Sequence, residues 1–181
     1  MKSNIIYNGN KCELTEDFTD IGYMAENIEV VDFYGKSKEI KRSDKKGSMT
    51  LLISFPNSDE IFLNELLKID EFLSHIQVDI NCYFIFNKEF ENQTALKNRL
   101  KKFEIVFDSE DEFGNMYGAK IVSGELEDML TKSLFLISKD GAVFYLDMPS
   151  NLEKEFDLQR LQVELNKAYI TYTGVGCESM N

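Results

Sequence analysis

The sequence contains few of the residues that mark several common classes of protein. Among 181 residues there are two prolines, one histidine and three cysteines. No CxxC pair occurs, which excludes a recognisable zinc motif. The cysteines are few and odd in number, which fits a reducing compartment better than a disulfide framework. A single histidine, His75, gives a Cys-His hydrolase no support. Its place near the end of a predicted helix favours a capping or surface histidine.

Long apolar runs and an excess of basic charge are also missing. No segment approaches the roughly 18 apolar residues of a membrane span, and residues 1–18 lack the apolar stretch of a signal peptide. The net charge is −12 and the pI is about 4.6, so the surface repels phosphate backbones and anionic lipids. We therefore expect a cytoplasmic protein that binds neither nucleic acid nor membranes.

No linker, internal repeat or low-complexity segment interrupts the chain. Its length suits one domain with a substantial core. We expect a single domain over residues 1–169, which includes an N-terminal hairpin within residues 1–15, and a C-terminal tail over residues 170–181. The basic stretch 36–46 is broken by acids and serines and is interpreted as a solvated loop.

Two turn motifs predict β-hairpins. Asn8-Gly9-Asn10 separates short alternating runs near the N-terminus, and Lys139-Asp140-Gly141 separates the apolar runs 133–137 and 142–146. Asn-Gly and Asp-Gly both suit tight hairpin turns.

Between these hairpins, strand and helix patterns alternate. Residues 49–55 form a nearly continuous apolar run, which is typical of a central strand buried on both faces. Pro56 ends this run, and Asn57 is a suitable N-cap for a helix with apolar residues at helical spacing. Further strands are predicted over 28–33, 78–86 and 103–107, and further helices over 89–102, 111–117 and 155–169. The order indicates a thioredoxin-like α/β sandwich, with a central mixed β-sheet flanked by helices and an added N-terminal hairpin.

In order and spacing, these pieces resemble the thiol peroxidase branch of the peroxiredoxins. The resemblance covers about residues 4–169. It rests on the opening hairpin, on Ser54-Phe55-Pro56, on the segment 113–119 (FGNMYGA) and on the leucine-rich lead into the hairpin at 126–146. It implies the peroxiredoxin form of the fold, thiol-dependent peroxidase activity, and a homodimer formed near the active-site face.

The catalytic motif of that family is degenerate in this chain. The family pattern Pro-x-x-x-Thr-x-x-Cys matches residues 56–63, where Pro56 is kept, Glu60 replaces threonine and Leu63 replaces the peroxidatic cysteine. Lys132 stands at the position of the family's late arginine and keeps a positive charge without the planar donor fork. The helix that carries the family's resolving cysteine, here 89–102, contains no cysteine.

These replacements remove the chemistry of peroxide reduction. The reaction needs a thiolate whose pKa is lowered by a helix N-terminus and a nearby cation. Leu63 has no nucleophile, and an ionised Glu60 only accepts hydrogen bonds and disfavours a nearby thiolate. We interpret the protein as non-catalytic. The apolar pocket at Leu63 is either filled core or a site for a partner's apolar side chain or a small apolar ligand; a regulatory subunit in a mixed oligomer with an active peroxidase is a further possibility.

The alternative function is a residual thiol-dependent peroxidase or antioxidant oxidoreductase that uses another cysteine. Cys82, in the predicted strand 78–86, is either a buried, inert side chain or a relocated nucleophile. Cys177, in the tail, is either an accidental thiol or a redox-reactive one that forms intermolecular disulfides. Cys12, just after the hairpin turn, is interpreted as structural.

The acidic run 108–112 is the remaining candidate for a metal site. It lacks the alternating ligands and central glycine of an EF-hand loop, so an acid-rich helix N-terminus is the better interpretation. No phosphate-binding glycine loop is present either. We therefore expect neither a metal nor a cofactor.

Overall fold

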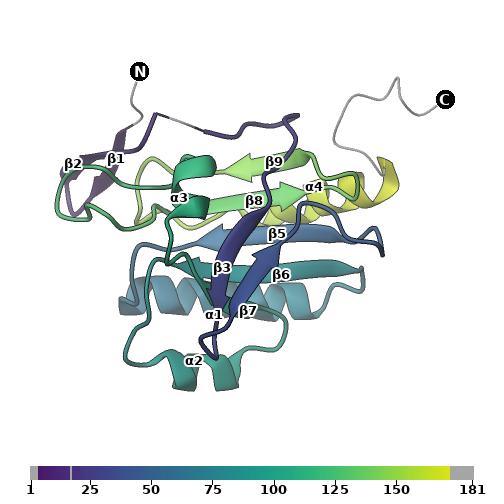
Figure 1. Ribbon diagram of the computed structural model, residues 1–181, viewed down its shortest axis with the longest axis horizontal. Helices are drawn as coiled ribbons and strands as arrows, with labels where there is room; N and C mark the ends of the chain where they lie inside the picture. Colours follow the sequence, from purple (N-terminus) through teal and green to yellow (C-terminus); the bar gives the residue numbers. More distant parts are fainter. Residues whose placement is uncertain (1–3, 17, 172–181) are drawn as a thin grey trace.

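The computed structural model describes residues 4–16 and 18–171, and its centre is a mixed sheet in the order β4-β3-β7-β6-β5-β8-β9 (Figure 1). Strand β5 pairs in parallel with β6, and β6 with β7, whereas the other neighbours are antiparallel. This arrangement confirms the predicted thioredoxin-like sandwich. The strands are β3 (Ile28–Asp32), β4 (Ser37–Ile40), β5 (Met49–Ser54), β6 (Ile80–Phe86), β7 (Glu104–Phe107), β8 (Ser133–Ile137) and β9 (Val143–Asp147).

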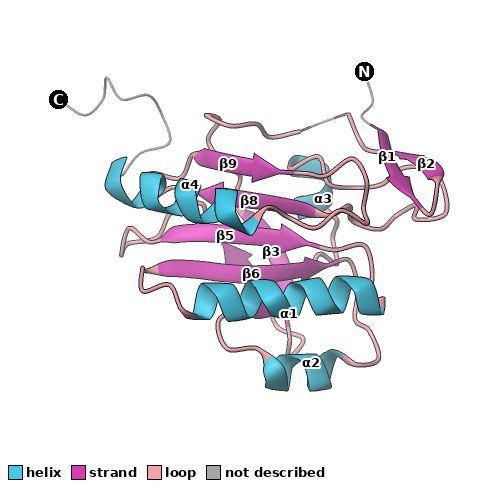
Figure 2. Cartoon of the chain, turned by 180° about the vertical axis from the view of Figure 1, so that it is seen from behind, coloured by secondary structure: helices cyan, strands magenta, loops and turns pink. Residues whose placement is uncertain are grey.

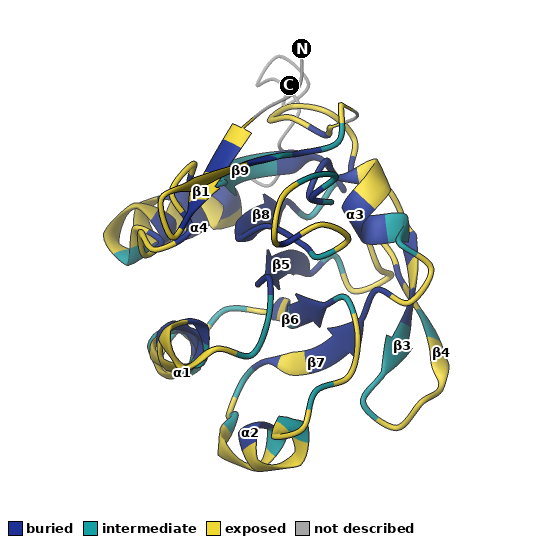
Figure 3. Ribbon diagram, turned by 90° about the vertical axis from the view of Figure 1, so that its left-hand side faces the viewer, coloured by how far each residue is buried: buried dark blue, intermediate teal, exposed yellow. Residues whose placement is uncertain are grey.

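Strand β5 is the centre of the core, as its continuous apolar sequence predicts. All six of its residues are buried. Leu51 and Ile53 face the core shared with α1 (Glu60–Ser74) and α4 (Leu158–Thr171), whereas Leu52 faces a second core with α3 (Glu112–Met116). Helices therefore cover both faces of the sheet (Figures 2 and 3).

The N-terminal hairpin forms a separate two-stranded sheet, as predicted, from β1 (Asn4–Tyr7) and β2 (Asn10–Glu13). Its turn residues Asn8 and Gly9 have φ angles of 51° and 78°, the left-handed conformation that a tight hairpin turn requires. The Tyr7 hydroxyl donates to Asp59 Oδ2 at 2.8 Å. The hairpin is therefore attached beside the beginning of α1.

Strand β4 corrects the prediction of a solvated loop over residues 36–46. Ser37 to Ile40 pair with β3 at the edge of the sheet. Charged residues such as Lys38 and Glu39 are usual on an edge strand, because they discourage pairing with other chains. The polar character of residues 37–40, which suggested a loop, is that of an exposed edge strand of the sheet.

Three helix boundaries also differ from the predictions. Helix α1 begins at Glu60, because the Asn57 side chain accepts a hydrogen bond from the Asp59 N–H at 2.9 Å and forms a turn before the helix. Helix α2 (Gln93–Arg99) is shorter than predicted. Helix α4 begins after Asp157, whose side chain accepts from the Arg160 N–H at 2.9 Å, and it continues to residue 171, past the expected start of the tail.

None of the helices in the described ranges has the length and apolar character needed to cross a bilayer.

Candidate functional site

The region that matches the family motif lies where β5 ends and α1 begins. Pro56 is buried at this junction. Helix α1 then turns one apolar stripe, which includes Phe62 and Leu66, onto the sheet. Leu63 and Leu67 lie beside that stripe, pack against the same core and are only half-buried, so part of this apolar side of α1 stays exposed.

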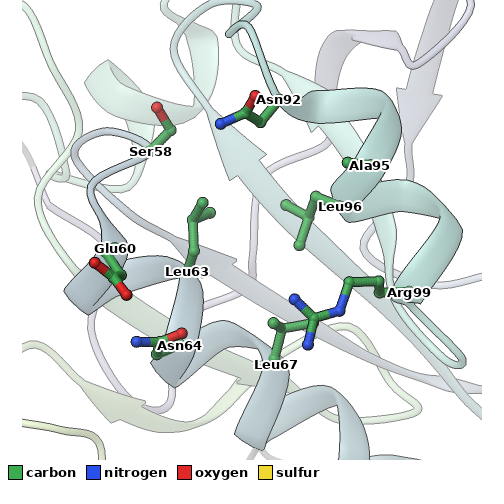
Figure 4. Close-up of a pocket in the computed structure, with 9 residues that line it drawn as sticks. All are labelled: Ser58, Glu60, Leu63, Asn64, Leu67, Asn92, Ala95, Leu96 and Arg99. Carbon is green, nitrogen blue, oxygen red and sulfur yellow. The ribbon is translucent and has the colours of Figure 1, made fainter.

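A groove of about 520 Å³ opens between α1 and α2 (Figure 4). Leucine side chains from both helices point into it, Leu63 and Leu67 from α1 and Leu96 from α2. Polar groups surround these side chains. The complete lining is Ser58, Glu60, Leu63, Asn64, Leu67, Asn92, Ala95, Leu96 and Arg99.

A second hollow of about 690 Å³ continues the groove along α1 and shares Asn64, Leu67 and Arg99 with it. Phe72 adds apolar surface there, and Lys68 and Glu71 add charge. Two of the predicted site residues, Glu60 and Leu63, thus lie together at one end of a long, partly apolar groove.

Lys132, the residue predicted to stand at the family's arginine position, does not line this groove. Its side chain is 1% exposed and forms an ion pair with Glu65 on the buried side of α1. Lys132 Nζ also donates to the backbone oxygen of Lys154 at 2.5 Å and lies 4.8 Å from the centre of the Phe156 ring. Burial lowers the pKa of Lys132, and the contact with Glu65 opposes that shift.

Glu65 completes this buried cluster. Its Oε2 accepts a hydrogen bond from the backbone N–H of Phe156 at 2.7 Å. The carboxylate thereby joins α1 to β8 through Lys132 and to the segment before α4 through Phe156. The Lys132 cation is thus held by a carboxylate in the core and is not among the residues that line the groove.

The cysteines in the described part of the chain are both buried. Burial raises the pKa of the Cys82 thiol to about 12, so this thiol is protonated at neutral pH. Cys12 is covered closely by the backbone, since a Cβ added to Gly124 would lie 2.6 Å from Cys12 Sγ. Cys177 lies outside the described residues.

The remaining candidates have structural roles. Asp108 is buried and accepts hydrogen bonds from the N–H groups of Phe113 and Gly114 at 2.9 and 2.8 Å, so it caps α3 as the acid-rich helix start predicted. His75 is exposed at the C-terminal cap of α1, 2.6 Å from Glu71. Within residues 4–16 and 18–171, no three histidine, cysteine or acidic side chains are grouped so that they could hold a metal ion.

The sequence reasoning missed Glu65, Asp70 and Arg99. A signal was present for the two acids, because they fall at helical spacing on the same stripe as Phe62 and Ile69. An acid on an apolar stripe is buried at a high cost unless it has a partner. Nothing in the local sequence marks Arg99, because its role depends on the distance between two helices.

Comparisons with known proteins agree with this architecture. The family model described as Redoxin matches residues 17–161. The structure is similar to a peroxiredoxin-like protein from Aquifex aeolicus, with a TM-score of 0.83, 16% identity, and coverage of 92% of this chain and 98% of that chain. It is also similar to a thiol peroxidase from Chromobacterium violaceum, with a TM-score of 0.80, 16% identity, and coverage of 93% and 99%.

A third similar structure is AhpC from Enterococcus faecalis, with a TM-score of 0.68, 13% identity, and coverage of 85% of this chain and 95% of that chain. No curated protein matches the sequence. At these identities the structural matches describe the fold, which is the peroxiredoxin form of the thioredoxin-like sandwich.

Proposed function

The chain belongs to the redoxin family, and from this premise we propose that it is a thiol peroxidase-like member that does not reduce peroxide and acts by binding. One observation carries the proposal. Leu63, at the position of the peroxidatic cysteine, faces a groove, while the cation at the arginine position, Lys132, is buried against Glu65.

The chemistry of the family reaction explains why this arrangement is non-catalytic. A thiolate attacks one peroxide oxygen, and a nearby cation lowers the pKa of the thiol. Leu63 has no atom that can attack. Lys132 cannot activate another group in the groove without leaving Glu65 unpaired in the core, which is strongly unfavourable. The acidic side chain of Glu60 also favours a protonated thiol over a thiolate.

The groove between α1 and α2 is the binding surface that supports the second half of the proposal. Its half-buried leucines would be filled core if α2 packed tightly against α1, but a volume of about 520 Å³ separates the helices. That volume is within the range of small-ligand sites, roughly 300 to 1,000 Å³. We propose that a small ligand or an apolar side chain of a partner occupies it.

The resemblance to the family also leads us to propose a cytoplasmic homodimer whose interface lies near the groove between α1 and α2. The alternative is that the chain is a regulatory subunit in a mixed oligomer with an active peroxidase. Co-purification from the native cell distinguishes the two. A second copy of the chain alone is expected, and an active peroxidase retained in stoichiometric amount would favour the mixed oligomer.

A peroxide-consumption assay tests the non-catalytic proposal. Hydrogen peroxide and an organic hydroperoxide are supplied with thioredoxin, thioredoxin reductase and NADPH, and NADPH oxidation is followed. We expect the rate with the protein to equal the rate without it. Sustained turnover would contradict the proposal.

Thiol labelling separates the alternative enzyme from the binding protein. We expect Cys82 and Cys12 to resist a maleimide in the native state and to react after unfolding, because both are buried. If turnover is observed, Cys177→Ser and Cys82→Ser identify the responsible thiol. Native labelling of Cys82 would revive the alternative.

A further inference from the structure

The polar side chains around the α1–α2 groove include several without protein partners. Ser58, Asn64, Asn92 and Arg99 line the groove, and their side chains make no hydrogen bond or ion pair to any described residue. Polar groups that surround an apolar surface and have no partner of their own are typical of small-ligand sites, where they orient the ligand.

Arg99 differs from the other cations near it. Lys101 is paired with Glu71, and Lys68 with Glu155, whereas Lys97 lies over the rings of Phe33 and Tyr34. Arg99 has no such contact with the described residues, even though acidic residues, its natural partners, outnumber basic ones by 32 to 20. Its guanidinium lies beside Leu67, away from Glu60 (Figure 4), where the groove meets the second hollow along α1.

We propose that the groove binds a small amphipathic carboxylate, with the carboxylate on Arg99 and an unbranched apolar chain along Leu67, Leu63 and Leu96. This inference rests on the proposed function, because it treats the groove as a binding site. The guanidinium offers a planar pair of donors that matches a carboxylate. The leucines supply an apolar surface for the chain, and the polar rim leaves it open to entry from solvent.

The distance along α1 from Glu60 to Leu67, beside which Arg99 lies, sets the length of the ligand. Glu60 and Leu67 are seven residues apart on α1, which corresponds to a rise of about 10 Å, or an extended alkyl chain of about eight to ten carbon atoms. Glu60 at the far end repels a second carboxylate. The site should therefore select decanoate over decanedioate, which carries an acid at both ends.

Titration of the full-length protein with decanoate, below its micellar concentration, tests the inference. Isothermal titration calorimetry gives the stoichiometry, and amide chemical shifts locate the site. We expect one ligand per chain, with shifts confined to α1 and α2. Decanol should bind at least tenfold more weakly because it lacks the charge that Arg99 recognises.

Three substitutions place the ligand in this groove. Arg99→Gln should weaken decanoate binding about tenfold or more, which is the loss of one charge-assisted hydrogen-bonding partner. Ala95→Trp should abolish binding, because Ala95 is an exposed groove residue and a large ring there fills the space. Lys88→Gln, an exposed cation outside the groove lining, is the matched charge control and should leave affinity unchanged.

Two results would overturn the inference. One is the absence of saturable binding by the wild-type protein. The other is binding that Arg99→Gln and Ala95→Trp leave intact, provided that far-UV circular dichroism shows both variants folded. Neither result bears on peroxide turnover, and turnover in the peroxide assay would contradict the proposed function whatever decanoate does.

Discussion

The buried pair of Glu65 and Lys132 is the most consequential feature at the scale of single residues. A lysine and a glutamate are both removed from solvent, and each has a further backbone partner, the Lys154 oxygen for Lys132 and the Phe156 N–H for Glu65. An ion pair in the core is stable only when its hydrogen bonds are satisfied in this way. Lys132, which we propose stands at the position of the family's arginine, is therefore part of the structural core.

Lys132→Met should therefore be strongly destabilising. The substitution leaves Glu65 buried without its cation, and we expect a loss of about 3 to 5 kcal/mol in the free energy of unfolding. Urea denaturation followed by circular dichroism measures it. Lys68→Met removes an exposed ion pair with Glu155 and serves as the control with little effect. A small loss for Lys132→Met would show that the buried pair is unimportant.

Leu63→Cys should not restore a reactive thiol. The added cysteine would lie near Glu60, with Lys132 still held by Glu65, so its pKa should be no lower than the ordinary value of about 8.5. The pH dependence of iodoacetamide alkylation measures this pKa, with Leu67→Cys on the same groove as the control. An alkylation midpoint below neutral pH, at position 63 alone, would mean that the activating environment survives.

At the scale of elements, one acid decides where α2 ends. Asp70 on α1 is buried and accepts hydrogen bonds from the backbone N–H groups of Lys101, Lys102 and Phe103 at 2.8 to 3.0 Å. Those N–H groups would otherwise donate within a longer helix. Asp70 thereby fixes the chain between α2 and β7 and keeps α2 short, which leaves Arg99 at the last turn beside the groove.

Asp70→Ala should make the segment between α2 and β7 more mobile. Three N–H groups lose their acceptor, of which the Phe103 N–H is buried and those of Lys101 and Lys102 are partly buried, and we expect the free energy of unfolding to fall by about 2 to 3 kcal/mol. Hydrogen–deuterium exchange should accelerate at residues 101–103, with little change in β5. Unchanged exchange at these three amides would contradict the role given to Asp70.

The elements whose structure depends on their own sequence were predictable, and those that depend on distant contacts were not. Strand β5 and both hairpins follow from apolar runs and turn residues. The end of α2 depends on Asp70, some 30 residues earlier in the chain, and β4 depends on β3 as a partner. The same division holds at the candidate site. The motif singled out Glu60 and Leu63, which line one groove, but the pairing of Lys132 with Glu65 depends on the tertiary fold.

At the scale of the whole molecule, the chain has the peroxiredoxin form of the thioredoxin-like fold, and we propose that this scaffold no longer holds a peroxidase site. The proposed homodimer is testable at this scale. Ile61, at the beginning of α1, is 49% exposed, and we propose that this apolar side chain, close to Leu63 on α1, is part of the dimer interface. We expect a dimer by sedimentation velocity at micromolar concentration and a monomer for Ile61→Asp. A monomeric wild-type protein would contradict the dimer.

We propose that no residue of this chain performs the peroxidase reaction. The most direct measurement is the mass of the intact, reduced protein after brief exposure to one equivalent of hydrogen peroxide, with peptide mapping of the cysteines. We expect every cysteine to stay a thiol on the timescale in which an active peroxidase is oxidised. Rapid, stoichiometric conversion of one cysteine to a sulfenic acid or a disulfide would contradict it.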